Sequence, residues 1–494
     1  SNNDDSNNND DSTDDSTDSN DDSSTSSGSW DASAVYIAGD IVTYNSRTYK
    51  AKWWTQGDIP GTEQWGPWED IGTSTDNDST DDSNDNTDNN SDDNSDSNDD
   101  SNNDDSNNND DSTDDSTDTS GSYTMTQEEL DTKESELTNS ELMSKVKDSI
   151  RTISNSLVDQ ISANNPNNPN NVKLVEGIIS KNDWEYLFPK RSPEYTYTNF
   201  LKAVGKFPAF CGEYTDGRDA EAICRKSLAT MFAHFTQETG GHSSGWDVPQ
   251  WRQALVHVRE MGWTEDMRGG YNSECNPDIW QGETWPCGTF DDGEYKSYFG
   301  RGAKQLSYNY NYGPFSEAVT GQISTLMEKP ELVADTWLNL ASAVFFYMYP
   351  QPPKPSMYHS IDGTWQPNER DISNGLVPGF GVTTQIINGG VECGGSVEVQ
   401  QSLNRISYYQ SFAQYLNVPI EDTEVLGCKG MKQFDSDGAG ALSIYWEEDW
   451  SYDGNTPDGK SYACQLVNYQ TPFTAFNKEN YTECVEKHFD VIVE

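Results

Sequence analysis

Residues 228–241 read Leu-Ala-Thr-Met-Phe-Ala-His-Phe-Thr-Gln-Glu-Thr-Gly-Gly. Apolar residues fall on one helical face and Gly240 and Gly241 follow, so the stretch predicts a helix that ends close to Glu238. The negative end of the helix dipole and apolar neighbours both disfavour a carboxylate. We therefore expect a raised pKa for Glu238, as a general acid requires. The alternative is a surface glutamate at a frayed helix end.

Similar helical periodicity recurs through residues 172–494, a stretch long enough to bury a core. We therefore expect a mainly α fold, with a principal domain over 172–430 and a C-terminal extension, 431–494, packed on it.

A shorter segment, residues 123–171, leads into this domain. Its apolar residues Leu142, Val146, Ile150, Ile153, Leu157 and Ile161 have helical spacing. Thr138 and Glu141 have the spacing of a capping box, so we expect one helix of about five turns over 138–161. Its apolar stripe should pack on the next domain.

Two tracts have a composition that cannot form a core. Residues 1–29 and 73–122 consist mainly of Asp, Ser, Asn and Thr, hold 9 and 18 Asp, and contain no Lys or Arg. Residues 1–18 recur letter for letter at 101–118. Because they lack apolar side chains and their carboxylates repel one another, we expect disordered linkers. Cation binding is the alternative, but the tracts lack the spaced glycine and terminal glutamate of a calcium loop.

The stretch between these tracts, residues 30–72, is dense in aromatic residues. Residues 40–44 and 47–51 alternate as strands do, and Asn45-Ser46 between them predicts a hairpin, so we expect a small all-β module. So small a unit cannot bury all of its aromatic rings. Exposed ring faces suit the apolar C–H faces of a polysaccharide.

The motif Ala51-Lys-Trp-Trp-Thr-Gln56 and the residues Tyr36, Tyr44 and Tyr49 resemble the type 3 chitin-binding modules, carbohydrate-binding families 5 and 12. The resemblance implies that Trp53 and Trp54 supply the binding face, with Tyr36 as a further candidate. The alternative is that one of the two tryptophans belongs to the core of the module.

The chain of 494 residues is strongly acidic, with a formal net charge of −53 and 32% apolar residues. It has no basic surface to displace counterions from phosphate and no apolar run of eighteen residues, so we expect neither nucleic acid nor a membrane as a partner. We expect a monomer.

The eight cysteines are even in number and lack zinc-site spacing, which favours disulfides in a secreted protein over free buried thiols, the alternative. The five histidines are scattered, so we expect no metal and no cofactor. The first residues show no export signal, and we expect that any such signal was removed or lies outside this sequence.

Six collinear stretches resemble the chitinases of glycoside hydrolase family 19. They are Phe235–Gly241, Val258–Gly262, Trp285–Cys287, Tyr298–Gly313, Pro353–Ser356 and Val377–Gly390. Their order and spacing match over residues 178–428. The resemblance implies a mostly helical, lysozyme-like bilobal domain with a cleft that cuts β-1,4-linked N-acetylglucosamine polymers with inversion.

Carried over position by position, Glu238 is implied as the general acid, Glu260 as the base that activates water, and Ser307 as the hydroxyl that holds this water. Inversion needs about 6.5–9.5 Å between the two carboxyl groups, so that a water fits. The implied sugar contacts and cleft positions are Thr239, Trp285, Gln305, Tyr310, Asn311, Lys354, Asn388 and Arg405. Asn311 and Arg405 have an alternative role as struts between the lobes.

The sequence before Glu260 differs from the plant pattern, so the base assignment rests on Arg-Glu-x-Gly and on the separation of 22 residues from Glu238. The alternatives for the base are Glu265, Glu274 and Glu283. Two cysteine pairs match family disulfides, Cys275–Cys287 and Cys393–Cys428. Two are paired by proximity in sequence alone, Cys211–Cys224 and Cys464–Cys484.

These expectations combine into a secreted endochitinase whose partners are chitin and chitooligosaccharides, with the small module holding it on insoluble chitin. One alternative is a muramidase-like endolysin that cleaves peptidoglycan. The other is a non-catalytic chitin-binding adhesin, which would not need to keep both Glu238 and Glu260.

Overall fold

The computed structural model describes residues 28–32, 34–36, 40–51, 55–56, 59–61, 68–73 and 123–494. The chain divides into two compact units, residues 1–114 and 115–494. The predicted linkers, 1–29 and 73–122, lie almost entirely outside the described residues, and so do Trp53 and Trp54.

The first unit contains a small β-module. Its four-stranded sheet has the order β1 (Gly28–Ser29), β3 (Ile41–Tyr44), β4 (Arg47–Ala51) and β6 (Trp68–Thr73), and β2 (Val35–Tyr36) pairs with β5 (Thr55–Gln56). Asn45 and Ser46 join β3 to β4 with positive φ angles of 49° and 63°, as a two-residue hairpin of type I′ requires. The predicted hairpin is therefore confirmed.

Tyr36, a candidate binding residue, belongs to the aromatic packing of this module. Its ring lies edge-on to Trp68 at a centroid distance of 5.2 Å, and its hydroxyl accepts a hydrogen bond from the Asp31 amide at 2.7 Å. Trp68 is buried together with Val42, Tyr49 and Ala51. The ring of Tyr36 therefore stabilises the fold of the module, whatever else it contacts.

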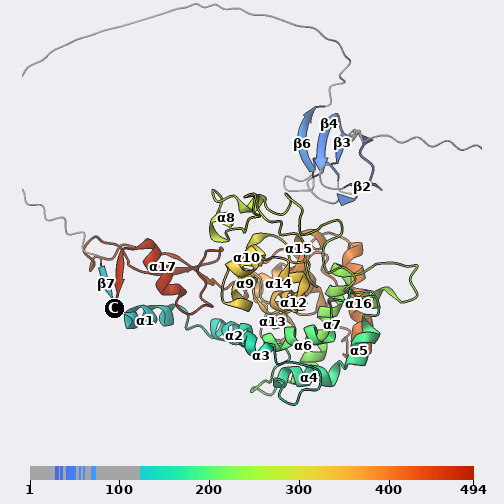
Figure 1. The fold of residues 1–494 in the computed structure, drawn as a ribbon, viewed down its shortest axis with the longest axis horizontal. Coiled ribbons are helices and arrows are strands. Elements are labelled where there is room, and N and C mark those ends of the chain that lie inside the picture. The colour runs from blue at the N-terminus through green and yellow to red at the C-terminus, as the bar shows by residue number, and fades with distance from the viewer. Residues whose placement is uncertain are drawn as a thin grey trace, which may run out of the picture. The chain divides into compact units, whose positions relative to one another are not determined.

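The second unit is mainly helical (Figure 1), as expected. Its helices are α1 (Gln127–Leu137), α2 (Glu141–Ile150), α3 (Asn155–Val158), α4 (Asn170–Ile178), α5 (Lys181–Leu187), α6 (Tyr197–Lys206), α7 (Ala220–Thr239), α8 (Trp280–Thr284), α9 (Asn309–Thr320), α10 (Ser324–Glu328), α11 (Leu332–Asp335), α12 (Leu338–Met348), α13 (Met357–Asp362), α14 (Glu369–Ser373), α15 (Phe380–Glu392), α16 (Gln400–Tyr415) and α17 (Asn480–His488), with short 3₁₀ turns at Gln250–Arg252 and Ser273–Cys275.

The core of this helical body forms around α7 and α12. All eleven residues of α12 are buried, so this apolar helix is enclosed on every side. α7 packs along α16 and against α13, and α6 packs against α12. This packing fixes the C-terminal end of α7, where Glu238 lies. Among the described residues no helix is long and apolar enough to cross a membrane.

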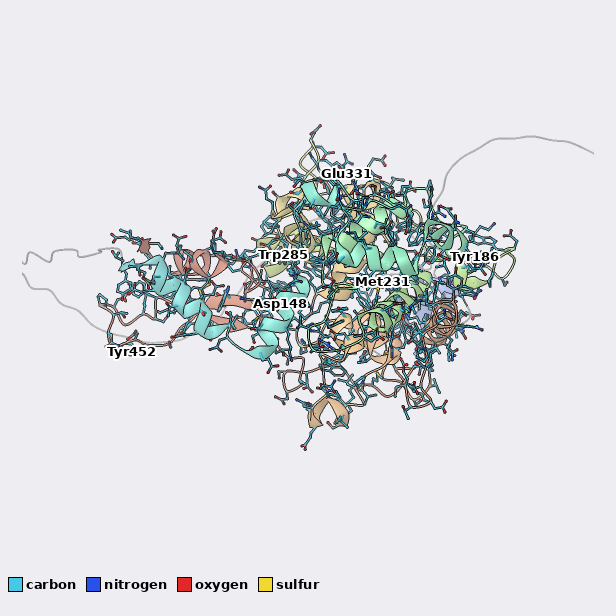
Figure 2. All side chains as sticks on the ribbon, turned by 90° about the horizontal axis from the view of Figure 1, so that it is seen from below. Asp148, Tyr186, Met231, Trp285, Glu331 and Tyr452 are labelled. Carbon is cyan, nitrogen blue, oxygen red and sulfur yellow. A yellow bond between two sulfur atoms is a disulfide. The ribbon has the colours of Figure 1, made fainter. Side chains whose placement is uncertain are left out.

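The two ends of this unit form a second, smaller core, which we call the terminal lobe (residues 123–150 and 441–494). β7 (Tyr123–Met125) pairs in parallel with β10 (Val491–Val493), and β8 (Tyr445–Glu448) pairs with β9 (Cys464–Val467). Met125, Leu130 and Met143 are buried together with Trp446, Tyr481 and Val485. Figure 2 shows Tyr452 at the far end of this lobe and Tyr186 at the opposite end of the helical body.

The single helix expected over 138–161 is wrong. Thr138 ends α1, Ser140 caps α2 by accepting a hydrogen bond from the Met143 amide, and residues 151–154 are extended between α2 and α3. The extended segment is held by Lys206, whose backbone oxygen accepts from the Ile153 amide and whose Nζ donates to the Ile153 oxygen at 2.8 Å. The apolar residues that predicted one helix therefore lie on two helices, α2 and α3, and on the segments next to them.

All eight cysteines are paired, as Cys211–Cys224, Cys275–Cys287, Cys393–Cys428 and Cys464–Cys484. These are the four pairs expected from the sequence. The last of them joins β9 to α17 inside the terminal lobe.

Candidate active site

Glu238 lies in the last turn of α7, and the residues after it fix the direction of the chain. A side chain at Gly240 would place its Cβ 2.2 Å from the Thr236 oxygen, so the close approach there requires glycine. The Thr239 hydroxyl accepts a hydrogen bond from the Leu255 amide at 2.9 Å, and the Thr239 carbonyl accepts one from Val256. The helix end is thereby joined to the segment that leads to Glu260.

Thr239 was expected to contact the sugar, and the structure gives it another role. Its side chain is fully buried, and its hydroxyl donates to the Phe235 oxygen while it accepts from Leu255. Both bonds are internal, so Thr239 is a positioning residue at the end of α7 in this conformation.

A network of buried charges surrounds Glu238. Arg405 on α16 is 1% exposed and donates to Glu238 at 2.6 Å and, through two nitrogens, to Glu392 at 2.7 and 2.9 Å. Asn388 adds a hydrogen bond to Glu392 at 2.8 Å. Arg405 is therefore shared between two carboxylates, which fits the electrostatic position implied for it.

His234 completes this network as a neutral ring. The Thr383 hydroxyl donates to the Phe380 oxygen, so it must accept from Nε2–H of His234, which leaves Nδ1 free to accept from Arg405 at 3.0 Å. Burial, with the charge of Arg405 adding to it, holds the pKa of His234 well below its usual range. His234 therefore fixes the orientation of the guanidinium without adding charge.

The raised pKa expected for Glu238 is wrong for the protein without substrate. Burial raises the pKa of this carboxyl, but Lys304 and Arg405 together outweigh burial and lower it below its usual value. Lys304 and Glu238 line the same small cavity. The helix dipole and the apolar wall were visible in the sequence, but the two cations come from distant parts of the chain.

Glu260 is held by neutral donors. The Tyr271 hydroxyl donates to Oε1 at 2.7 Å and the Gly300 amide donates to Oε2 at 3.1 Å. Backbone bonds from Glu260 to Gly300 and from Gly302 to Val258 align the two segments. Burial and the neighbouring Glu260 raise the pKa of Tyr271, so its hydroxyl remains a donor.

The structure also separates Glu260 from the alternatives for the base. Both carboxylate oxygens of Glu265 are engaged, by Arg259 and Arg301 at 2.7 and 2.6 Å. Glu274 accepts from Ser273 on the exposed surface. Glu283 is exposed on α8. Among the four glutamates, Glu260 is therefore held by neutral donors, whereas Glu265 is paired with two arginines and the other two lie at the surface.

Gln305 lies beside Glu260, and Ser307 is bonded to Gln305. A Cβ at Gly300 would meet the side chains of Gln305 at 2.9 Å and Glu260 at 3.3 Å, so both side chains converge on this glycine. The Ser307 hydroxyl donates to the backbone oxygen of Gln305, and the Asn311 side chain donates to the backbone oxygen of Ser307 at 3.0 Å. Tyr310 follows in the first turn of α9 and stacks on Tyr308.

Two further residues that were expected to line the cleft are Lys354 and Trp285. Lys354 donates to the Ile386 oxygen at 3.0 Å, and burial, with Lys304 adding to it, lowers the pKa of its amine. Trp285 is 2% exposed and packs over Gly313, where a Cβ would come within 2.3 Å of the indole. The structure thus brings Arg405 to Glu238, joins Asn388 to the same network through Glu392, and brings Gln305 close to Glu260.

Sequence reasoning missed three residues of this site: Lys304, Glu392 and Tyr271. Lys304 lies inside the motif Tyr298–Gly313, so its position next to Gln305 was a usable signal. Glu392 and Tyr271 gave none, because only the fold brings them to Arg405 and Glu260.

Two protein-family models match parts of this chain. The family model described as chitinase class I, glycoside hydrolase family 19, matches residues 178–428, and the model of carbohydrate-binding module family 5/12 matches residues 29–69. Chitinase 9 of Oryza sativa subsp. japonica is 36% identical over 270 residues, which cover 53% of this chain and 73% of the relative.

Endochitinase 2 of Solanum tuberosum is 35% identical and covers 52% of this chain and 76% of its own length. Among solved structures, chitinase C from Streptomyces griseus HUT6037 is 21% identical, with a TM-score of 0.34, and the match covers 82% of this chain and 100% of that one.

Proposed function

The chain belongs to the class I chitinases, glycoside hydrolase family 19, and we propose that it is a secreted endochitinase that cleaves the β-1,4 bonds of chitin with inversion. The observation that carries the proposal is the contrast between two glutamates within the matched region. Glu238 lies in a buried charge network, and Glu260 is oriented by neutral donors with no cation bound to it among the described residues.

Glu238 supplies the proton in this mechanism. Its carboxyl protonates the glycosidic oxygen, the bond from this oxygen to C1 breaks, and Arg405 and Lys304 stabilise the carboxylate that forms. Because the same cations lower the pKa of Glu238 in the free protein, the carboxyl must take up a proton before each turnover. We therefore expect the activity to be highest on the acidic side of neutrality.

Glu260 removes a proton from water on the opposite face of the sugar. The water oxygen bonds to C1 as the leaving group departs, and its proton passes to Glu260, which Tyr271 and Gly300 hold in place. We assign Ser307, which is bonded to Gln305 beside Glu260, to hold this water. Gln305, Tyr310 and Asn311 would contact the sugar beside the scissile bond, and Trp285, Lys354 and Asn388 would line the cleft.

The stereochemistry of the first product tests this mechanism. Inversion predicts that ¹H NMR of the fresh products of the chitin hexamer shows the α-anomer at the new reducing end. The β-anomer would exclude Glu260 as a base that acts on water. Release of muropeptides from peptidoglycan, without cleavage of the hexamer, would favour the endolysin instead.

The family 5/12 match supports a second part of the proposal, in which the N-terminal module holds the enzyme on solid chitin. Deletion of residues 1–121 should lower activity on solid chitin about tenfold and leave activity on the soluble hexamer unchanged. The reason is that binding of the module to solid chitin raises the local concentration of substrate at the active site, whereas the soluble hexamer reaches the site by diffusion. The double variant Trp53→Ala and Trp54→Ala in the full chain is the matched control and should reproduce the deletion. Equal losses on both substrates would contradict the anchor role.

A further inference from the structure

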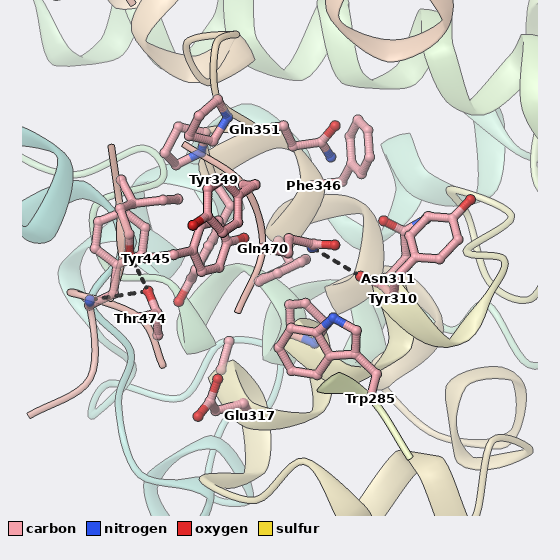
Figure 3. Close-up of a pocket in the computed structure, with 18 of the residues that line it drawn as sticks. Trp285, Tyr310, Asn311, Glu317, Phe346, Tyr349, Gln351, Tyr445, Gln470 and Thr474 are labelled. Atoms are coloured by element: carbon pink, nitrogen blue, oxygen red, sulfur yellow. Dashed lines mark hydrogen bonds between the residues drawn. The ribbon is translucent and has the colours of Figure 1, made fainter. Parts of the chain in front are cut away.

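A cavity of about 430 Å³ lies between the helical body and the terminal lobe. One side is formed by Trp285, by α9 and by the end of α12, and the other by Tyr445 and residues 468–477 of the terminal lobe. Figure 3 shows Tyr445, Gln470 and Thr474 facing the side chains of the helical body. The volume falls within the range of about 300–1,000 Å³ that small-molecule sites occupy.

This cavity adjoins the candidate active site. Leu306, Tyr310 and Asn311 line it, and Asn311 donates to the backbone oxygen of Ser307. From the other side, Gln470 donates to the backbone oxygen of Tyr310 at 3.3 Å, as the dashed line in Figure 3 shows. A polymer lying along Tyr310 and Asn311 would therefore meet the terminal lobe next.

The lining of the cavity selects a neutral ligand with both apolar faces and polar edges. Rings such as Phe346, Tyr349 and Tyr445 form most of the wall, and Gln351 and Gln470 add amide groups. The described lining contains no Lys, Arg or Asp, and Glu317 is its one ionisable carboxyl. Burial, and after it the neighbouring Glu483, raises the pKa of Glu317 to about 7, so this group is frequently uncharged.

A buried donor in this wall has no acceptor. Trp285 is 2% exposed, and its indole Nε1 has no hydrogen-bond partner among the described residues. In Figure 3 the nitrogen lies on the side of the indole nearest Tyr310 and Gln470. Because Trp285 lines the cavity, the signal of its indole N–H group should report on a ligand bound there.

We propose that the terminal lobe and Trp285 form an additional sugar subsite, which binds a further N-acetylglucosamine unit of the chitin chain, beyond the units that Tyr310 and Asn311 contact. The pyranose ring stacks on the aromatic wall, and the acetamido group is bound by the amides of Gln351 and Gln470. The inference rests on the proposed function. It goes beyond it because Tyr445, Tyr469 and Gln470 lie outside the matched region, 178–428.

Kinetics with oligosaccharides of different length test the subsite in the full chain. Gln470→Ala and, separately, the half-exposed Tyr469→Ala should lower the ratio of kcat/KM for the hexamer to kcat/KM for the trimer by about fivefold, because only the longer chain reaches the cavity. Tyr452→Ala changes an 83% exposed residue of the same lobe outside the cavity and should leave the ratio unchanged. An unchanged ratio in both cavity variants, with native melting temperatures, would overturn the subsite.

A binding measurement separates this proposal from the proposed function. In the Glu238→Gln protein with ¹⁵N-labelled tryptophan, the hexamer should shift the indole signal of Trp285, assigned with Trp285→Phe, and Gln470→Ala should reduce that shift. A shift without cleavage by the native protein would refute the enzyme and keep the subsite. Cleavage without a shift would refute the subsite alone, and the absence of both would refute the two together.

Discussion

Glu238 and Glu260 are held by two regions of the molecule that use different chemistry. Around Glu238, α7, α15 and α16 bury Arg405 between two carboxylates, and Lys304 adds a second positive charge. Around Glu260, the only hydrogen-bond donors among the described residues are a tyrosine hydroxyl and a backbone amide. Charges change the proton affinity of a carboxyl strongly, whereas neutral donors mainly fix its orientation.

This difference shows that burial alone does not make a carboxyl an acid. The side chain of Glu238 is only 19% exposed, yet its cations favour the ionised form in the absence of substrate. The same cations therefore stabilise the carboxylate that remains after proton transfer, whereas the donors around Glu260 fix the orientation of its carboxyl group.

The largest expected effect comes from exchanging the two carboxyl groups for amides. Glu238→Gln and Glu260→Gln should each lower kcat on the chitin hexamer about 10³-fold, because each removes one proton transfer. The two variants should differ on a substrate with a dinitrophenolate leaving group, which needs no proton. On this substrate Glu238→Gln should recover most of the native rate, while Glu260→Gln should remain inactive.

Added azide sharpens this comparison, because it is a nucleophile that needs no base. It should restore the activity of Glu260→Ala and give a glycosyl azide, and it should not restore Glu238→Ala on the hexamer. If the dinitrophenyl substrate instead rescued the Glu260 variant, the two roles would have to be exchanged.

A smaller effect is expected at the hydroxyl that orients Glu260. Tyr271→Phe removes the 2.7 Å hydrogen bond and should lower kcat about tenfold with little change in KM, because the base turns away from the water while sugar contacts stay intact. Tyr308→Phe is the matched control, since its ring lies 5.1 Å from Tyr271 and its hydroxyl is not bonded to Glu260. A rise in KM alone would identify Tyr271 as a sugar contact.

The sequence predicted the elements that local patterns determine. The apolar period and paired glycines placed the end of α7 at Glu238, and Asn45-Ser46 placed the hairpin between β3 and β4. Both depend on neighbours within one turn of the chain, which periodicity and turn preferences describe directly.

The sequence did not predict what depends on distant neighbours. The spacing of Val146, Ile150 and Ile153 predicted one helix, but α2 ends at Ile150 and both backbone groups of Ile153 are bonded to the distant Lys206. The sign of the pKa change at Glu238 failed for the same reason, because Lys304 and Arg405 lie far from it in sequence. The period of apolar residues shows which face of a segment is buried, but it does not show which other segments that face packs against.

The smallest expected effect is a shift of the pH profile, and two variants should move it in opposite directions. Lys304→Met removes a cation that favours the carboxylate, so the pKa of Glu238 should rise. Glu392→Gln leaves Arg405 paired with Glu238 alone, so the pKa of Glu238 should fall further. Lys329→Met removes an exposed charge and is the control.

The profile of kcat/KM against pH reads these shifts in the free enzyme. Glu238 must be protonated to react, so kcat/KM falls as the pH rises through its pKa. This descending limb should move to higher pH in Lys304→Met and to lower pH in Glu392→Gln.

Because the pKa of Glu238 is lowered on folding, its ionised form also stabilises the native protein at neutral pH, and this stabilisation is lost as the pH falls through the folded-state pKa. Lys304→Met should therefore lower the melting temperature at pH 7 more than at pH 3. If the descending limb of kcat/KM moved in the same direction in both variants, the charge network would not control the pKa of Glu238.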